Sequence, residues 1–262
     1  MMTGKAATPV FDLSGRVALV TGASSGLGER FAEILAASGA AVVLAARRTD
    51  RLEQTCAAIK AKGGRAIAVA MDVADEASTV AAYDAAEAAF GTVDTIIANA
   101  GMNSEGSILD LPVEEFDRVM AVNLRGVFLT AREGAKRLIA SGSRESGRGR
   151  IVITASITAH KVEAGLAAYS GSKAGVLQMG KVMARDWIRQ GINVNMICPG
   201  YIKTEINGEW FDTEAGAKQI AKFPRRRIME QGELDTMLLY LASDASGGVT
   251  GTSFTIDDGQ SL

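Results

Sequence analysis

The chain has 262 residues, of which 47% are hydrophobic and 22% charged, and its formal net charge is −2. These values are ordinary for a soluble globular protein, and a chain of this length can bury a large core without disulfide bonds. The balanced charge gives no indication of a nucleic-acid or membrane surface.

Seven short apolar segments are the candidate strands. Most of them lack the alternation of apolar and polar residues that marks a strand with one exposed face. They are therefore expected to be buried on both faces, as in a parallel sheet. They span residues 16–21, 41–46, 66–71, 92–98, 150–154, 193–198 and 253–256.

Apolar residues recur at helical spacing between these segments. The strand–helix alternation predicts a doubly wound (Rossmann) seven-stranded parallel sheet with helices on both faces, in a single domain over residues 1–262. The expected helices cover about residues 27–38, 52–62, 75–90, 113–140, 168–190, a stretch after residue 204, and 232–243.

Several stretches of the chain stand apart from this pattern. Residues 1–11 are interpreted as a mobile lead-in, because the N-terminus lacks the apolar core of a secretion signal, and a cytoplasmic location is expected. Residues 203–227 are long for a connection and contain aromatic residues, which predicts a substrate lid, with plain surface packing as the alternative. The short basic clusters at 144–150 and 225–227 are expected to be solvated.

Composition limits two further features. No apolar run reaches the roughly 18 residues that a membrane span needs. The two cysteines, Cys56 and Cys198, are too few for a disulfide framework and are expected to be buried and reduced. No metal site is expected.

A glycine-rich turn at residues 21–28 connects the first predicted strand to the first helix. Backbone N–H groups and the helix dipole favour an anion there, which predicts binding of a dinucleotide pyrophosphate. Gly22 would permit the tight turn, Gly26 the approach of the phosphate, and Gly28 the packing of helix on strand. A turn needed only for packing is the alternative. The remaining residues expected to contact the nucleotide here are Ser24, Ser25 and Leu27.

The end of the second predicted strand indicates which nucleotide is bound. An acid at this point would bond the ribose 2′-hydroxyl of NAD, but the sequence has Ala46 followed by Arg47 and Arg48. A guanidinium can bind a 2′-phosphate in a bidentate manner, so NADP(H) is favoured over NAD(H), with Arg47 as the principal contact. Ser24 or Ser25 would add a hydrogen bond. Alternatively, both arginines simply face solvent.

Asp72 and Val73 follow the third predicted strand. The Asp72 carboxylate could accept a hydrogen bond from the adenine amino group. It could equally be the cap of the next helix, because aspartate is a good N-cap.

Tyr169 and Lys173 are four residues apart on a predicted helix, so their side chains share one face. A free tyrosine, with a pKa near ~10, gives up its proton poorly at neutral pH. An ammonium at ~4 Å, with an effective dielectric of ~20, would favour the phenolate by roughly 4 kcal/mol, or about three pK units. Tyr169 is thus predicted to be a general acid/base, with Ser156 beside it.

Asn123 lies on the apolar stripe of the long predicted helix. A buried amide without partners costs about 1–3 kcal/mol, so Asn123 is expected to bond a specific group. A plain core asparagine is the alternative.

Six of these features follow the carboxyl ends of predicted strands. In a parallel sheet those ends lie along one edge, where ligands bind. They are Gly22, Arg47, Asp72, Asn99, Ser156 and Pro199.

Over about residues 12–259 the sequence resembles the short-chain dehydrogenase/reductase family. Ser156 precedes Tyr169 by thirteen residues, which is the spacing of that family. Two departures are Ala98, where the family often has Asn, and Asp258, where Gly is commoner. The segments that carry the resemblance are residues 21–28, Asn99-Ala100-Gly101, Asn123, Ser156, residues 169–173 and Pro199-Gly200.

The resemblance implies hydride transfer between NADP(H) and the carbon of a carbonyl or secondary alcohol. Tyr169 would be the acid/base, Ser156 would hold the substrate oxygen, and Lys173 would bind the nicotinamide ribose and lower the tyrosine pKa. Asn123 would hold a water of a proton relay. A homotetramer or dimer built on the helices of Asn123 and Tyr169 is usual in such proteins. Further nucleotide contacts are implied for Asn99, Ala100, Gly101, Pro199, Gly200, Ile202 and Thr204.

The predicted substrate is a small or medium ketone, keto ester or cyclic ketone. Its candidate contacts are His160, which could instead be a solvated loop residue, and Tyr201, Trp210 and Phe211. A narrower alternative is a 3-oxoacyl-[acyl-carrier-protein] reductase, although these generally have a basic residue where Gln190 precedes Gly191. Arg144, Arg148 and Arg150 could provide a substitute patch. A non-enzymatic alternative is a catalytically silent NADP-binding sensor or scaffold, but such proteins usually lose the tyrosine or the lysine.

Overall fold

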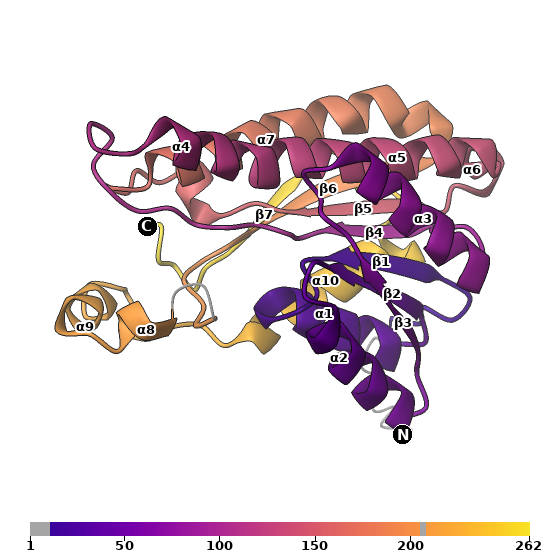
Figure 1. Ribbon diagram of the computed structural model, residues 1–262, viewed down its shortest axis with the longest axis horizontal. Coiled ribbons are helices and arrows are strands. Elements are labelled where there is room, and N and C mark those ends of the chain that lie inside the picture. The colour runs from indigo at the N-terminus through magenta and orange to yellow at the C-terminus, as the bar shows by residue number, and fades with distance from the viewer. Residues whose placement is uncertain (1–10, 205–207) are drawn as a thin grey trace, which may run out of the picture.

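The structure is a computed structural model that describes residues 11–204 and 208–262. Its centre is a seven-stranded parallel sheet with the order β3-β2-β1-β4-β5-β6-β7 (Figure 1). The predicted doubly wound parallel sheet is therefore confirmed. The strands are β1 (Val17–Thr21), β2 (Ala41–Ala46), β3 (Arg65–Ala70), β4 (Thr95–Ala98), β5 (Gly149–Thr154), β6 (Ile192–Pro199) and β7 (Ser253–Ile256).

Helices cover both faces of this sheet (Figure 1). On one face α1, α2 and α10 enclose an apolar core, and on the other α3, α5 and α7 enclose a second one. The helices are α1 (Gly26–Ala37), α2 (Thr49–Ala61), α3 (Glu76–Phe90), α4 (Val113–Met120), α5 (Gly126–Ala140), α6 (Ser143–Ser146), α7 (Ala167–Trp187), α8 (Gly208–Phe211), α9 (Glu214–Ile220) and α10 (Asp235–Ala242).

The burial of the strands follows their position in the sheet. β1, β2, β4 and β5 are buried along their whole length, as expected for strands covered on both faces. The edge strands β3 and β7 are only partly buried. Among the described residues, no helix is both long enough and apolar enough to cross a membrane. Cys56 and Cys198 are buried and unpaired, as predicted.

The long helix predicted at 113–140 is helical throughout but not uniformly α-helical. A π-helical turn at Ala121–Arg125 joins α4 to α5 and contains Asn123. Such single π turns are frequent at functional sites, because they re-aim side chains within an otherwise regular helix.

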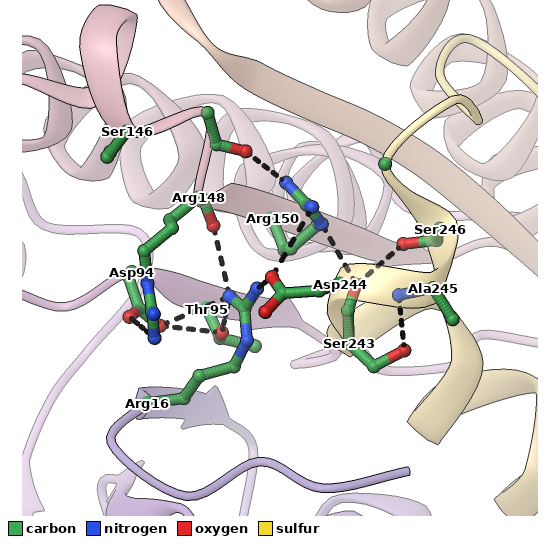
Figure 2. Close-up of polar contacts among 12 residues, drawn as sticks. Arg16, Asp94, Thr95, Ser146, Arg148, Arg150, Ser243, Asp244, Ala245 and Ser246 are labelled. Atoms are coloured by element: carbon green, nitrogen blue, oxygen red, sulfur yellow. Dashed lines mark hydrogen bonds and ion pairs between the residues drawn. The ribbon is translucent and has the colours of Figure 1, made fainter. Parts of the chain in front are cut away.

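The prediction that the basic cluster at 144–150 is solvated is wrong for Arg150. This side chain is only 3% exposed, and its guanidinium donates to the carbonyl oxygens of Gly147, Gly149 and Ser243. It belongs to a charge cluster, in part buried, at the amino ends of β1, β4 and β5 (Figure 2). That edge of the sheet is opposite to the one where the predicted ligand-binding residues lie.

Candidate active site

A cavity of about 780 Å³ lies at the carboxyl ends of the strands. It is lined by every residue that the sequence predicted to contact a nucleotide, from Gly22 to Thr204. It is also lined by Ser156, Tyr169 and Lys173, whereas Asn123 lies outside its lining. One cavity thus brings together residues that are almost 200 positions apart in the sequence.

The glycine turn has no room for side chains at two of its positions. Gly22 has a φ of +68°, and a Cβ built there would lie 2.8 Å from the Cα of Ala100. A Cβ at Gly28 would overlap the carbonyl oxygen of Gly22. These close approaches hold the N-terminus of α1 against the ends of β1 and β4, so that backbone N–H groups are presented to the cavity.

Thr21 fixes the neighbouring loop to the glycine turn. Its Oγ1 accepts hydrogen bonds from the backbone N–H groups of Asn99 and Ala100, at 3.0 and 3.1 Å. The Asn99 amide donates to the Thr21 carbonyl oxygen at 3.1 Å. The cavity floor between β1 and β4 is therefore rigidly bonded.

Arg48, rather than Arg47, makes the contact with the glycine turn. Its Nε donates to the Ser24 hydroxyl at 3.2 Å and its Nη2 to the Ser25 hydroxyl at 2.7 Å. Both arginines are exposed and line the cavity. The sequence placed Arg47 first, but the direction that each side chain takes after β2 orients Arg48 toward the two serines.

The alternative reading of Asp72 as a helix cap is wrong. The N-cap of α3 is Asp75, whose side chain accepts from the Ser78 N–H at 2.6 Å. Asp72 accepts from the Ala74 N–H at 3.0 Å and lines the cavity together with Val73.

Ser156 and Tyr169 both line the cavity, and the Ser156 hydroxyl acts to lower the pKa of Tyr169. Ser156 is the N-cap of a 3₁₀ turn and accepts from both the N–H and the hydroxyl of Thr158, at 3.2 and 3.1 Å. Since both of these bonds use Ser156 as the acceptor, its own hydroxyl proton remains available for a bond within the cavity. Sequence reasoning missed Thr158, although a threonine two residues after a capping serine was a usable signal.

Lys173 lies below the ring of Tyr169. Its ammonium is 5.6 Å from the ring centroid and donates to the Thr154 carbonyl oxygen at 2.8 Å. Burial lowers the pKa of Lys173 to about 8. Burial also raises the pKa of Tyr169, and the opposing effect of the Ser156 hydroxyl does not cancel it. The predicted lowering of the tyrosine pKa is therefore not found in this structure, because desolvation of the buried phenol is the larger effect.

Asn123 is fully buried and bonded through both ends of its amide. The oxygen accepts from the Met102 N–H, and the nitrogen donates to the Met102 carbonyl and to the Ser172 hydroxyl, all at 2.9–3.0 Å. The expectation that this amide bonds a specific group is confirmed. Asn123 connects the loop after β4 to α7, the helix that carries Tyr169.

The substrate candidates divide into two groups. Tyr201, Trp210 and Phe211 line the cavity, whereas His160 does not. His160 is exposed, with its Nε2 3.8 Å from the sulfur of Cys198. Its interpretation as a substrate contact is not supported by this position.

The wall formed by Tyr201 is held from two directions. Its ring stacks on Phe223 at 5.4 Å and meets Phe211 edge-on at 5.8 Å. The Gln260 side chain accepts from the Tyr201 N–H at 2.6 Å. The C-terminal segment thus supports this wall, a role that the sequence pattern had not revealed.

A family model described as short chain dehydrogenase matches residues 16–215. D-threitol dehydrogenase of Mycolicibacterium smegmatis is 34% identical, over 96% of this chain and 95% of that protein. A short-chain type dehydrogenase/reductase from Mycobacterium marinum has a TM-score of 0.90 at 37% identity, covering 97% and 98% of the two chains. A gluconate 5-dehydrogenase from Burkholderia cenocepacia J2315, in complex with NADP and tartrate, has a TM-score of 0.90 at 33% identity, covering 96% and 97%.

The chain therefore belongs to the short-chain dehydrogenase/reductase family. It is an oxidoreductase of the kind that uses a nicotinamide cofactor.

Proposed function

We propose that this protein transfers a hydride between NADP(H) and the carbon of a carbonyl or secondary alcohol, with Tyr169 as the general acid/base. The observation that carries the proposal is the meeting of Ser156, Tyr169 and Lys173 on the floor of a cavity whose other end is the glycine turn. A hydroxyl, a phenol and an ammonium at one point suit proton transfer to a substrate oxygen.

The residues at the other end of the cavity fit a dinucleotide. Gly22 and Gly28 leave the backbone at the α1 N-terminus uncovered by side chains, which suits a pyrophosphate. Arg48, bonded to Ser24 and Ser25, suits a 2′-phosphate. The cofactor, when bound, supplies or accepts the hydride. The Burkholderia gluconate 5-dehydrogenase was crystallised with NADP, which supports this choice of nucleotide.

The chain's own residues position the substrate oxygen and move its proton. Ser156 would hold the carbonyl oxygen with the hydroxyl proton that Thr158 orients. Tyr169 would give its phenolic proton to that oxygen during reduction and take it back during oxidation. Lys173 would bind ribose hydroxyls, and Asn123 would act as a positioning residue for α7 and for the proton relay implied by the family.

Removal of either arginine is expected to weaken NADPH binding selectively. For Arg48→Ala we expect a rise of about 10–100-fold in the Kd of NADPH, the size of a lost charged hydrogen bond, and less than threefold for NADH. Arg47→Ala should act in the same direction. Binding titrations with both nucleotides measure this, with Lys62→Ala, at the far end of α2, as the control. Equal losses for the two nucleotides would contradict the proposed NADP preference.

The two directions of the reaction are expected to respond oppositely to pH. Reduction needs the neutral phenol and oxidation needs the phenolate. Because burial raises the pKa of Tyr169 from its ordinary value, the phenol is favoured at neutral pH and is lost only as the pH rises through the raised pKa. Initial rates from pH 6 to 11 should show oxidation increasing with pH and reduction decreasing at the alkaline end. An oxidation rate that is highest below pH 7 would exclude Tyr169 as the base.

Two alternatives are less well supported. The arginine patch invoked for an acyl carrier protein includes the buried Arg150, at the edge of the sheet opposite the cavity. A protein that only binds the nucleotide would not need Ser156, Tyr169 and Lys173 together in the lining of one cavity. NADPH oxidation with a panel of ketones, keto esters and thioesters tests all three readings.

Two structural features support further parts of the proposal. Phe116, Phe128, Val182 and Ile188 are exposed apolar residues on or beside the helices of Asn123 and Tyr169, which favours a dimer or tetramer through these helices. The lid proposed for residues 203–227 is supported by Trp210 and Phe211, which line the cavity. Residues 205–207 lie outside the described part of the chain, as do residues 1–10 of the expected lead-in.

A further inference from the structure

The positive charges that line the cavity are unevenly distributed along it. Among the described lining residues the cations are Arg47, Arg48 and Lys173. The two arginines lie at the glycine turn, and the ammonium of Lys173 is engaged by the Thr154 carbonyl. Beyond Tyr169 and Lys173, no cation is found among the described residues that line the substrate end of the cavity.

This substrate end instead contains two carboxylates. Glu163 lies in the segment between Ser156 and Tyr169, with its side chain 31% exposed. Glu105 lies on the loop after β4 and accepts from the Asn103 amide at 2.9 Å. Lys161, 4.0 Å from Glu163, donates to the Gln260 carbonyl at 3.0 Å and does not line the cavity.

Glu163 shares this part of the lining with two further polar residues. They are Tyr201 and Gln219, a residue of α9 in the proposed lid. Burial and the nearby Glu163 carboxylate raise the pKa of Tyr201 to about 12, so this hydroxyl stays protonated. An amide, a phenol and a carboxylate therefore line this end of the cavity, together with the apolar surface of Trp210 and Phe211, whose ring meets that of Tyr201 edge-on.

We propose that this group, Glu163 with Tyr201 and Gln219, selects an uncharged, hydroxyl-bearing substrate, namely a polyol in oxidation and the corresponding hydroxyketone in reduction. This inference rests on the proposed function. A carboxylate accepts hydrogen bonds from substrate hydroxyls, and a site built to bond hydroxyls rejects analogues that lack them. Acidic substrates would meet two carboxylates without a compensating cation.

A matched set of four-carbon carbonyls tests the inference. Erythrulose is a neutral hydroxyketone, butanone lacks the hydroxyls, and acetoacetate carries a negative charge. Their kcat/KM values are measured with whichever nucleotide the protein oxidises. We expect erythrulose to exceed butanone by at least tenfold and acetoacetate to be the poorest substrate.

Variants at Glu163 connect this preference to the residue. In Glu163→Gln the ratio of erythrulose to butanone should fall about tenfold, the size of a hydrogen bond to a charged group. In Glu163→Lys the order of erythrulose and acetoacetate should reverse. Glu145→Gln, on the exposed α6 at the opposite edge of the sheet, is the matched control and should leave all ratios unchanged.

The possible failures are distinguishable. If butanone or acetoacetate is reduced as well as erythrulose, or if Glu163→Gln leaves the ratio unchanged, the proposed substrate class is overturned and the oxidoreductase function stands. If neither nucleotide is oxidised with any ketone, keto ester or thioester, the proposed function fails, and the substrate class fails with it.

Discussion

Replacement of Tyr169 with phenylalanine is expected to lower kcat by about 10²–10⁴-fold in both directions of the reaction. This is the usual contribution of a positioned general acid or base. The ring remains in place, so only the hydroxyl that shares the cavity lining with Ser156 is lost. Steady-state rates with NADPH and a reducible ketone, and with NADP⁺ and the matching alcohol, measure the loss.

Nucleotide affinity and stability are the controls for this variant. Tyr169 lies at the other end of the cavity from the glycine turn, so the Kd of NADPH should stay within about twofold of the parent value. The unfolding midpoint should also be nearly unchanged, because the hydroxyl faces the cavity. If turnover remained within tenfold of the parent, the hydroxyl of Tyr169 would not be the proton donor.

The parallel sheet could be predicted because its signal is local. Runs such as Val17–Thr21 and Ala41–Ala46 contain almost only apolar residues, and covering by helices on both faces is the only environment that suits them. The positions of the ligand-binding residues followed from the same argument. Parallel strands place their carboxyl ends on one edge, and the cavity lies there.

Side-chain direction could not be predicted in the same way. Arg47 and Arg48 are adjacent and chemically identical, so the sequence cannot show that Arg48 reaches the serines of the glycine turn. The pKa of Tyr169 depends on where the Lys173 ammonium points. The spacing of four residues correctly placed Lys173 on the same face of α7 as Tyr169. Its hydrogen-bond partner, the Thr154 carbonyl, is on β5 and could not be predicted from that spacing.

Arg150 was mistaken for a solvated residue because its neighbours form a short basic run. Its main contacts include the carbonyl of Ser243, which is 93 positions away in the sequence. Long-range partners of this kind leave no periodic pattern. The charge cluster of Figure 2 could therefore not be found from composition or spacing.

Replacement of Arg16 with methionine is expected to lower the free energy of unfolding by about 3 kcal/mol, the lower end of the cost of breaking a buried ion pair. Arg16 is 2% exposed and donates to Thr95 and to the Arg148 carbonyl, at 3.2 and 3.0 Å. It also pairs with Asp244 and, at 3.5 Å, with Asp94 (Figure 2). Urea unfolding at a fixed protein concentration measures the change.

The origin of this loss can be separated by comparing the two aspartates. The Asp94 side chain is 15% exposed and its pKa is already raised by burial, so loss of Arg16 leaves a carboxylate that only Arg148, at 3.5 Å, still compensates. The Asp244 side chain is 72% exposed, so Asp244→Asn should cost less than about 1 kcal/mol. If the cost comes from the stranded charge of Asp94, adding Asp94→Asn to Arg16→Met should restore part of the stability. A double variant whose losses simply add would mean that Arg16 stabilises the sheet through its hydrogen bonds to Thr95 and Arg148 and not through the ion pair.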